Sequence, residues 1–217
     1  MGSSNGLICL FFSSINEAWC NNYVVYNPCI ESHIEIKDHR EFEEKEIQYG
    51  FGYVNLLDDY EIINIDFVED MQYADMVVSV YSVRSKQWRH KYVEKTLDYD
   101  KQPWACSKFV GELIKETQYW GVIVGKEGAL KKCIFAFDLG KEEFKIMPLP
   151  KPNLGDDDGL RRLGFGLCNI NDCLYAWGKY NEGYLELWKF KDGGVGVESW
   201  IKLWAFNVME PVGCSRL

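Results

Sequence analysis

The chain has 217 residues, of which 47% are hydrophobic, 26% are charged and 15% are aromatic. This composition excludes a disordered chain or a coiled coil, because neither carries so many aromatic side chains. The 33 acidic residues outnumber the 24 basic ones, and the net charge of −9 repels nucleic-acid phosphates and anionic lipid headgroups. We therefore expect neither nucleic acid nor a membrane as a partner.

The cysteine content and the N-terminus indicate a cytoplasmic or nuclear protein. Eight cysteines are too few for a disulfide-stapled secreted scaffold, and a chain of this length can bury a core without such staples. The apolar run Leu7–Phe12 is too short for a signal peptide or a membrane span, and no basic segment precedes it. We expect reduced thiols.

The many aromatic residues and the 19 glycines indicate strands joined by tight turns, and the sequence carries a weak internal repeat. Four short runs of apolar and aromatic residues each end near a large ring. The four runs are Tyr23–Pro28, Val78–Ser82, Ile134–Asp138 and Leu185–Trp188. Their rings are Tyr26, Tyr81, Phe137 and Trp188, separated by 55, 56 and 51 residues. A period of about fifty residues is typical of a kelch propeller blade.

A second aromatic residue follows the ring after a polar turn, which predicts a hairpin with both rings in one core. The pairs are Tyr81 with Trp88, Phe137 with Phe144 and, in the longer fourth copy, Trp188 with Trp200, where Asp192–Gly194 would form the turn. The predicted fold is therefore all-β, a kelch-like β-propeller or partial propeller of about four repeats. It would occupy residues 1–210 and leave residues 211–217 as a C-terminal tail. A β-sandwich is the alternative, because short strands at this spacing suit both.

The sequence contains no recognisable catalytic, metal or cofactor site. The segments Gly50–Gly52 and Gly164–Gly166 begin like dinucleotide-binding motifs, but no βαβ pattern surrounds either one. Cys168 and Cys173 could supply only half of a zinc site, since no second pair or histidine lies nearby. We expect no cofactor and no enzymatic activity.

In chain order, these hairpins resemble the plant F-box-associated domain, a kelch-related propeller region of plant F-box proteins. The resemblance begins at Gly2–Leu10, includes the segments Val80–Arg84 and Trp88–Arg89, and extends to about residue 204. The matching motif residues are Asn5, Gly6, Leu7, Asn27, Pro28, Gly50, Phe51, Gly52, Tyr53, Asp59, Tyr60, Tyr81, Trp88, Trp120, Phe137, Asp138, Phe144, Trp188 and Trp200. We expect these residues to specify the fold.

The sequence departs from the family at three motifs. The usual Trp-Asn-Pro carries Tyr26, the usual His-Trp is Tyr119–Trp120, and the usual Asp-Tyr-Lys ends in Glu61. In the family, a helical F-box that binds Skp1 precedes the Gly-Ser-x-Asn-Gly motif, with which this sequence begins. Skp1 is therefore expected as a partner only if an upstream F-box is present in the full-length protein.

One segment gives conflicting signals. Phe109, Val110, Leu113, Ile114 and Thr117 are spaced as on one face of a helix, and periodicity alone predicts a helix over Cys106–Thr117. The family places a strand just before its His-Trp motif. We therefore expect this segment to be mainly extended.

The resemblance implies a protein-interaction module, the substrate-recruiting part of an SCF-type ubiquitin ligase. The net charge of −9 favours a basic protein target, mainly through the rate of association. Target binding is expected in the loops outside the repeat, whose candidate residues are Trp19, Tyr99, Trp104, Asp156, Asp157 and Asp158. A lectin-like propeller that grips glycans with Trp19, Trp104 and the loop Asp156–Asp158 is the alternative. A propeller enzyme is the weakest hypothesis.

Overall fold

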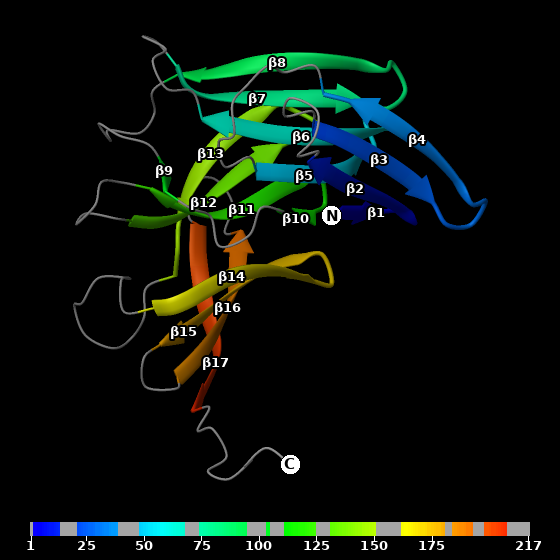
Figure 1. Cartoon of the computed structure of the whole chain (residues 1–217). Coiled ribbons are helices and arrows are strands. Elements are labelled where there is room, and N and C mark those ends of the chain that lie inside the picture. The colour runs from blue at the N-terminus through cyan, green and yellow to red at the C-terminus, as the bar shows by residue number, and fades with distance from the viewer. Residues whose placement is uncertain are drawn as a thin grey trace, which may run out of the picture.

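The computed structural model describes residues 2–13, 21–38, 48–67, 74–94, 103–104, 111–124, 131–150, 162–180, 184–192 and 198–207. The regular structure in these ranges is entirely β-strand, and the strands pair in chain order into four antiparallel sheets, here called blades 1 to 4 (Figure 1). Within these ranges there is no helix that could span a membrane.

Each blade has four strands in sequence order. Blade 1 consists of β1 (Gly2–Ser4), β2 (Leu7–Ser13), β3 (Asn21–Asn27) and β4 (Ser32–Lys37). Blade 2 consists of β5 (Gln48–Val54), β6 (Asp59–Phe67), β7 (Ala74–Ser82) and β8 (Gln87–Glu94). Blade 3 consists of β10 (Glu112–Ile114), β11 (Thr117–Val124), β12 (Lys131–Asp138) and β13 (Glu143–Pro148), with the short β9 (Pro103–Trp104) paired to β11. Blade 4 consists of β14 (Arg162–Ile170), β15 (Cys173–Tyr180), β16 (Tyr184–Asp192) and β17 (Glu198–Asn207).

The repeat read from the sequence is the blade itself. The four repeat rings, Tyr26, Tyr81, Phe137 and Trp188, lie on the third strands β3, β7, β12 and β16. The prediction of a kelch-like, partial propeller of four repeats is confirmed, and a two-sheet sandwich does not describe the four separate sheets.

The predicted ring pairs are right in blades 2 and 3 and wrong in blade 4. Tyr81 lies directly opposite Trp88 with ring centroids 5.1 Å apart, and Phe137 lies opposite Phe144. In blade 4 the ring opposite Trp200 is Phe190, at 5.2 Å, whereas Trp188 lies opposite Lys202. The reason is that β16 and β17 pair up to Asp192 and Glu198, which places residue 190 rather than 188 across from residue 200.

The hairpin turns repeat from blade to blade. Asn5 and Gly6 both have positive φ, 45° and 82°, which is the two-residue turn that joins twisted strands with least strain. Between the third and fourth strands, a four-residue turn recurs whose last residue is left-handed, namely Glu31, Lys86 and Glu142. The residue before each turn caps it: the side-chain oxygens of Asn27, Ser82 and Asp138 accept backbone N–H bonds at 2.9–3.0 Å.

The segment with conflicting signals is extended where it is described. Residues 112–114 form β10, Lys115 and Glu116 form a turn, and β11 begins at Thr117. Residues 106–110 lie outside the described ranges. Consecutive residues of a strand point to opposite faces, so Leu113 packs toward blade 2 and Ile114 packs toward blade 4. Because this sheet is buried on both sides, its apolar residues follow a spacing that resembles one face of a helix.

The hydrophobic core lies between successive blades. Three apolar clusters separate blades 1 and 2, blades 2 and 3, and blades 3 and 4. We call the face toward the preceding blade the front and the face toward the following blade the back. The repeat rings Tyr81 and Phe137 lie on the fronts of their blades, and Trp188 shares the front of blade 4 with its cross-strand neighbour Ala176.

Glycines of β5 allow the innermost strands to approach closely. A Cβ at Gly50 would lie 2.7 Å from the Gln118 side chain of blade 3, and one at Gly52 would lie 2.9 Å from Leu113 Cδ1. The first strands β1, β5, β10 and β14 contact one another in that order. In the described part of the chain the sheets do not close into a ring, and Figure 1 shows blade 4 set apart from blade 1.

Indole groups tie blade 2 to blade 1 and blade 4 to blade 3. Trp88 Nε1 donates to the Lys37 carbonyl of blade 1 at 3.4 Å, and Trp200 Nε1 donates to the Pro148 carbonyl of blade 3 at 3.2 Å. Both carbonyls belong to the last residue of the preceding blade's fourth strand. Trp88 and Trp200 thus make the same kind of hydrogen bond between neighbouring blades.

We predict that Trp88→Ala lowers the free energy of unfolding by about 3 kcal/mol, the lower end of the range for a large core ring. The substitution removes ring contacts to Tyr81 and Tyr23 as well as the bond to blade 1. Urea unfolding measures the loss, and the 59% exposed Tyr92, changed to Ala, serves as the control, with an effect within about 0.5 kcal/mol. An unchanged unfolding midpoint for Trp88→Ala would contradict this stabilising role of Trp88.

Candidate functional site

A polar cleft of about 830 Å³ lies where turns of all four blades come together. Most of its lining belongs to the hairpins formed by the first and second strands, and blade 3 adds the turn between β12 and β13. The lining residues are Ser3, Ser4, Asn5, Tyr53, Asn55, Leu56, Leu113, Lys115, Glu116, Thr117, Asp138, Gly140, Lys141, Asn169 and Asp172. This cleft is the candidate functional site, because it is the place where one ligand could contact every blade.

Hydrogen bonds across blade boundaries fix the walls of the cleft. Glu116 Oε1 accepts bonds from both the backbone N–H and the side-chain amide of Asn55, each at 2.7 Å. On the other side of blade 3, Asn169 Nδ2 donates to the Leu113 carbonyl at 2.7 Å. Blades 2, 3 and 4 therefore present one continuous polar wall.

The cleft offers hydroxyls, amides and charges of both signs. Lys141 Nζ pairs with Asp138 Oδ2 at 3.2 Å, and the Tyr53 hydroxyl donates to Asp58 Oδ1 at 2.5 Å. That hydroxyl and the Arg84 guanidinium lower the pKa of the Asp58 carboxyl, so it is ionised at neutral pH. Such a lining suits hydrogen bonding to a polar, mixed-charge ligand such as a polypeptide segment.

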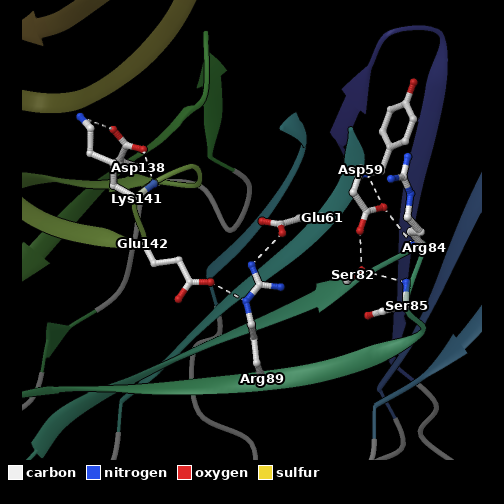
Figure 2. A network of polar contacts seen from close by, with 10 residues as sticks. Asp59, Glu61, Ser82, Arg84, Ser85, Arg89, Asp138, Lys141 and Glu142 are labelled. Carbon is white, nitrogen blue, oxygen red and sulfur yellow. Dashed lines mark hydrogen bonds and ion pairs between the residues drawn. The ribbon is translucent and has the colours of Figure 1, made fainter. Parts of the chain in front are cut away.

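The family motifs of blade 2 meet in one polar network (Figure 2). Asp59 Oδ1 accepts bonds from the backbone N–H groups of Tyr60 (2.7 Å) and Arg84 (2.9 Å), and the Ser82 hydroxyl donates to its other oxygen. The Arg84 guanidinium also pairs with the Asp58 carboxylate at 2.5 Å. Asp59 thereby joins the start of β6 to the turn between β7 and β8.

A second network explains the departure at Glu61. This carboxylate is buried, and Arg89 Nη2 donates to its Oε1 at 2.7 Å, while Arg89 Nε bonds Glu142 of blade 3 (Figure 2). Burial raises the pKa of Glu61, and the bond to Arg89 opposes that rise only in part. Trp88 and Arg89 are neighbours on opposite faces of β8, so one ties blade 2 to blade 1 and the other ties it to blade 3.

The loop residues expected to bind a partner are not brought together by the described structure. Trp19, Tyr99 and the loop Asp156–Asp158 lie outside the described ranges. Trp104 lies in β9, where its backbone pairs with Ile123 rather than forming a free loop.

The structure also bears on the metal hypothesis. Neither Cys168 nor Cys173 forms a disulfide within the described part of the chain. Across the ranges described, no group of three or more His, Cys, Asp or Glu side chains could hold a metal ion.

Sequence reasoning missed most of the cleft. Asn55, Lys115, Glu116, Asn169 and Asp172 were not singled out, although Asn5, Tyr53 and Asp138 were noted as family motif residues. The available signal was the recurrence of short polar turns after each first strand. The sequence alone does not show how the blades pack, and this packing brings the turns together around one cleft.

We predict that Glu61→Gln becomes more favourable relative to the native chain as pH rises from about 4 to about 7. The folded-state pKa of Glu61 lies above its ordinary 4.5, so its contribution is full below that value and is lost as the carboxyl ionises. Urea unfolding across this pH range measures the difference, with the exposed Glu143→Gln as control. A difference that grows in favour of the native chain with rising pH would contradict this assignment.

The chain resembles known proteins over nearly its whole length. Residues 1–212 match the family model described as the F-box associated beta propeller domain. An F-box/kelch-repeat protein of Arabidopsis thaliana is 24% identical over 212 residues, which cover 94% of this chain and 51% of that protein. The chain thus spans about half the length of this curated relative.

Among solved structures, a β-fructofuranosidase of Bombyx mori, a mutant in complex with sucrose, is similar with a TM-score of 0.42 and 10% identity. The match covers 87% of this chain and 44% of that one. This likeness is too distant to bear on function. The family match covers all four blades, and the chain belongs to the F-box associated β-propeller family.

Proposed function

We propose that this chain is the target-binding domain of an SCF-type ubiquitin ligase, in which an F-box supplied by the full-length protein recruits Skp1. The observation that carries the proposal is the family match over residues 1–212, supported by the F-box/kelch-repeat relative. The domain itself acts by binding and not by catalysis. Its place of action would be the cytoplasm or the nucleus.

The polar cleft is the proposed target site. Every blade contributes to it, so its shape depends on the assembled domain, and its turns can vary without disturbing the cores between blades. Lys115 and Asp172 project at exposed, left-handed turn positions, φ 54° and 55°, where their charges are available to a partner. The net charge of −9 favours a basic protein segment.

The glycan alternative rests on Trp19, Trp104 and the loop Asp156–Asp158, and it stays a prediction. No described aromatic side chain other than Tyr53 lines the cleft. A glycan array would test this alternative independently of protein binding.

We predict that the 217-residue chain binds its protein target without binding Skp1 or supporting ubiquitin transfer. Fusing an F-box to its N-terminus should add Skp1 binding and leave target binding unchanged, because the two contacts use separate segments. Pull-down of both forms with purified Skp1 and with the captured target measures this division. Skp1 retained by the bare chain, or a target lost without the F-box, would contradict it.

We also predict that reversing both cleft charges, Lys115→Glu with Asp172→Lys, weakens target binding about tenfold or more. The matched control reverses Lys86 and Glu31, which occupy equally exposed left-handed turn positions outside the cleft. Affinity by titration calorimetry and unfolding midpoints separate binding from stability. Both double variants keep the net charge at −9, so equal loss in the control would show that the affinity does not depend on the charges of the cleft.

A further inference from the structure

Two exposed leucines lie in the turn that joins β5 to β6, at the edge of the polar cleft. Leu56 is 79% exposed, more than any other large apolar residue in the described ranges, and Leu57 is 45% exposed. Leu56 also lines the cleft. A partner bound in the cleft could therefore cover this leucine while it hydrogen-bonds to the polar wall.

Hydrogen bonds from two turns fix the backbone around these leucines. The Leu57 N–H donates to the Val54 carbonyl at 3.2 Å. The Asp58 N–H donates to the Asn55 carbonyl, also at 3.2 Å. Arg84, from the turn between β7 and β8, donates to the Leu57 carbonyl at 3.3 Å and to the Asp58 carbonyl. A turn held in this way loses little conformational freedom when a partner binds, which lowers the cost of burying its leucines.

A carboxylate lies beside the leucines. Glu116 Oε1 accepts both bonds from Asn55, the residue that immediately precedes Leu56. The other oxygen of Glu116 faces Gly140, where an added Cβ would lie 3.1 Å away, so the missing side chain leaves room at this oxygen. Among the described residues, no lysine or arginine pairs with Glu116.

The charges of the cleft lining favour a basic group at this place. The lining holds three acidic residues and two lysines, and one of those lysines, Lys141, already pairs with Asp138. A lysine or arginine of a partner could bind Glu116 through a charge-assisted hydrogen bond. An apolar contact bordered by polar ones is the usual arrangement of a protein interface.

We propose that the cleft recognises a target segment in which a large apolar side chain stands next to a lysine or an arginine. The apolar side chain packs on Leu56 and Leu57, and the basic group binds Glu116. This inference rests on the proposed target-binding function and specifies the class of target that the cleft takes.

A selection from random peptides displayed on phage tests the inference. The library is first depleted on immobilised Leu56→Ser and then selected on the native 217-residue chain. The enriched peptides should carry a large apolar residue beside a lysine or an arginine. Glu116→Gln keeps an oxygen for Asn55 but loses the charge, and it should weaken binding of the enriched peptides about fivefold or more.

The turn between β3 and β4 provides matched controls. Ile30 is 70% exposed and Glu31 is exposed, but neither residue lines the cleft. Depletion of the library on Ile30→Ser should leave no peptides to enrich, and Glu31→Gln should not change the affinity of the enriched peptides. Urea unfolding midpoints check that the variants fold, and Leu56→Ala replaces Leu56→Ser if that midpoint falls.

Three results would overturn the inference: no enrichment after depletion on Leu56→Ser, equal enrichment after depletion on Ile30→Ser, or enriched peptides that lack the basic residue or bind Glu116→Gln unchanged. Failure of the proposed function would look different. In that case an F-box fusion of the chain, assembled into the ligase, would bind an enriched peptide on a carrier protein with the same dependence on Leu56 and Glu116, but would transfer no ubiquitin to it.

Discussion

The packing of one sheet against the next is the constraint on which the rest of this structure depends. A single four-stranded antiparallel sheet has two faces, and the apolar side chains of both must be covered. In blades 2 and 3 both faces are covered, and the three clusters between blades contain most of the buried aromatic and aliphatic residues. The glycines that allow close approach, the indole hydrogen bonds and the Glu61–Arg89–Glu142 network all stabilise the packing between blades.

The motifs shared with the family do two kinds of work. Asn5–Gly6 and the caps at Asn27, Ser82 and Asp138 shape individual turns. The consecutive residues Trp88 and Arg89 instead connect blade 2 to blade 1 and to blade 3, because their side chains extend from opposite faces of β8. The turns can therefore vary while the faces preserve the fold.

How far the sequence could predict this structure depended on the range of the interactions. Hairpins depend on residues close in sequence, so the pairing of Tyr81 with Trp88 could be predicted from spacing alone. The ring opposite Trp200 was mispredicted because Asp192, which the Asp192–Gly194 motif places in the turn, is still paired with Glu198 in the strands. Most of the cleft was missed, since residues such as Asn55 and Glu116 are 61 residues apart and meet only when blades 2 and 3 pack.

Native-state hydrogen exchange tests most directly the claim that stability resides between blades. Backbone amides of β6, β7, β11 and β12 lie on both sides of the largest cluster, and we predict that they exchange together, with the largest opening free energy of the described strands. Amides of β1 and β17, which each pair with only one neighbouring strand of their sheet, should exchange at lower free energy. A slowest-exchanging set confined to one sheet, with each blade opening independently, would contradict the account.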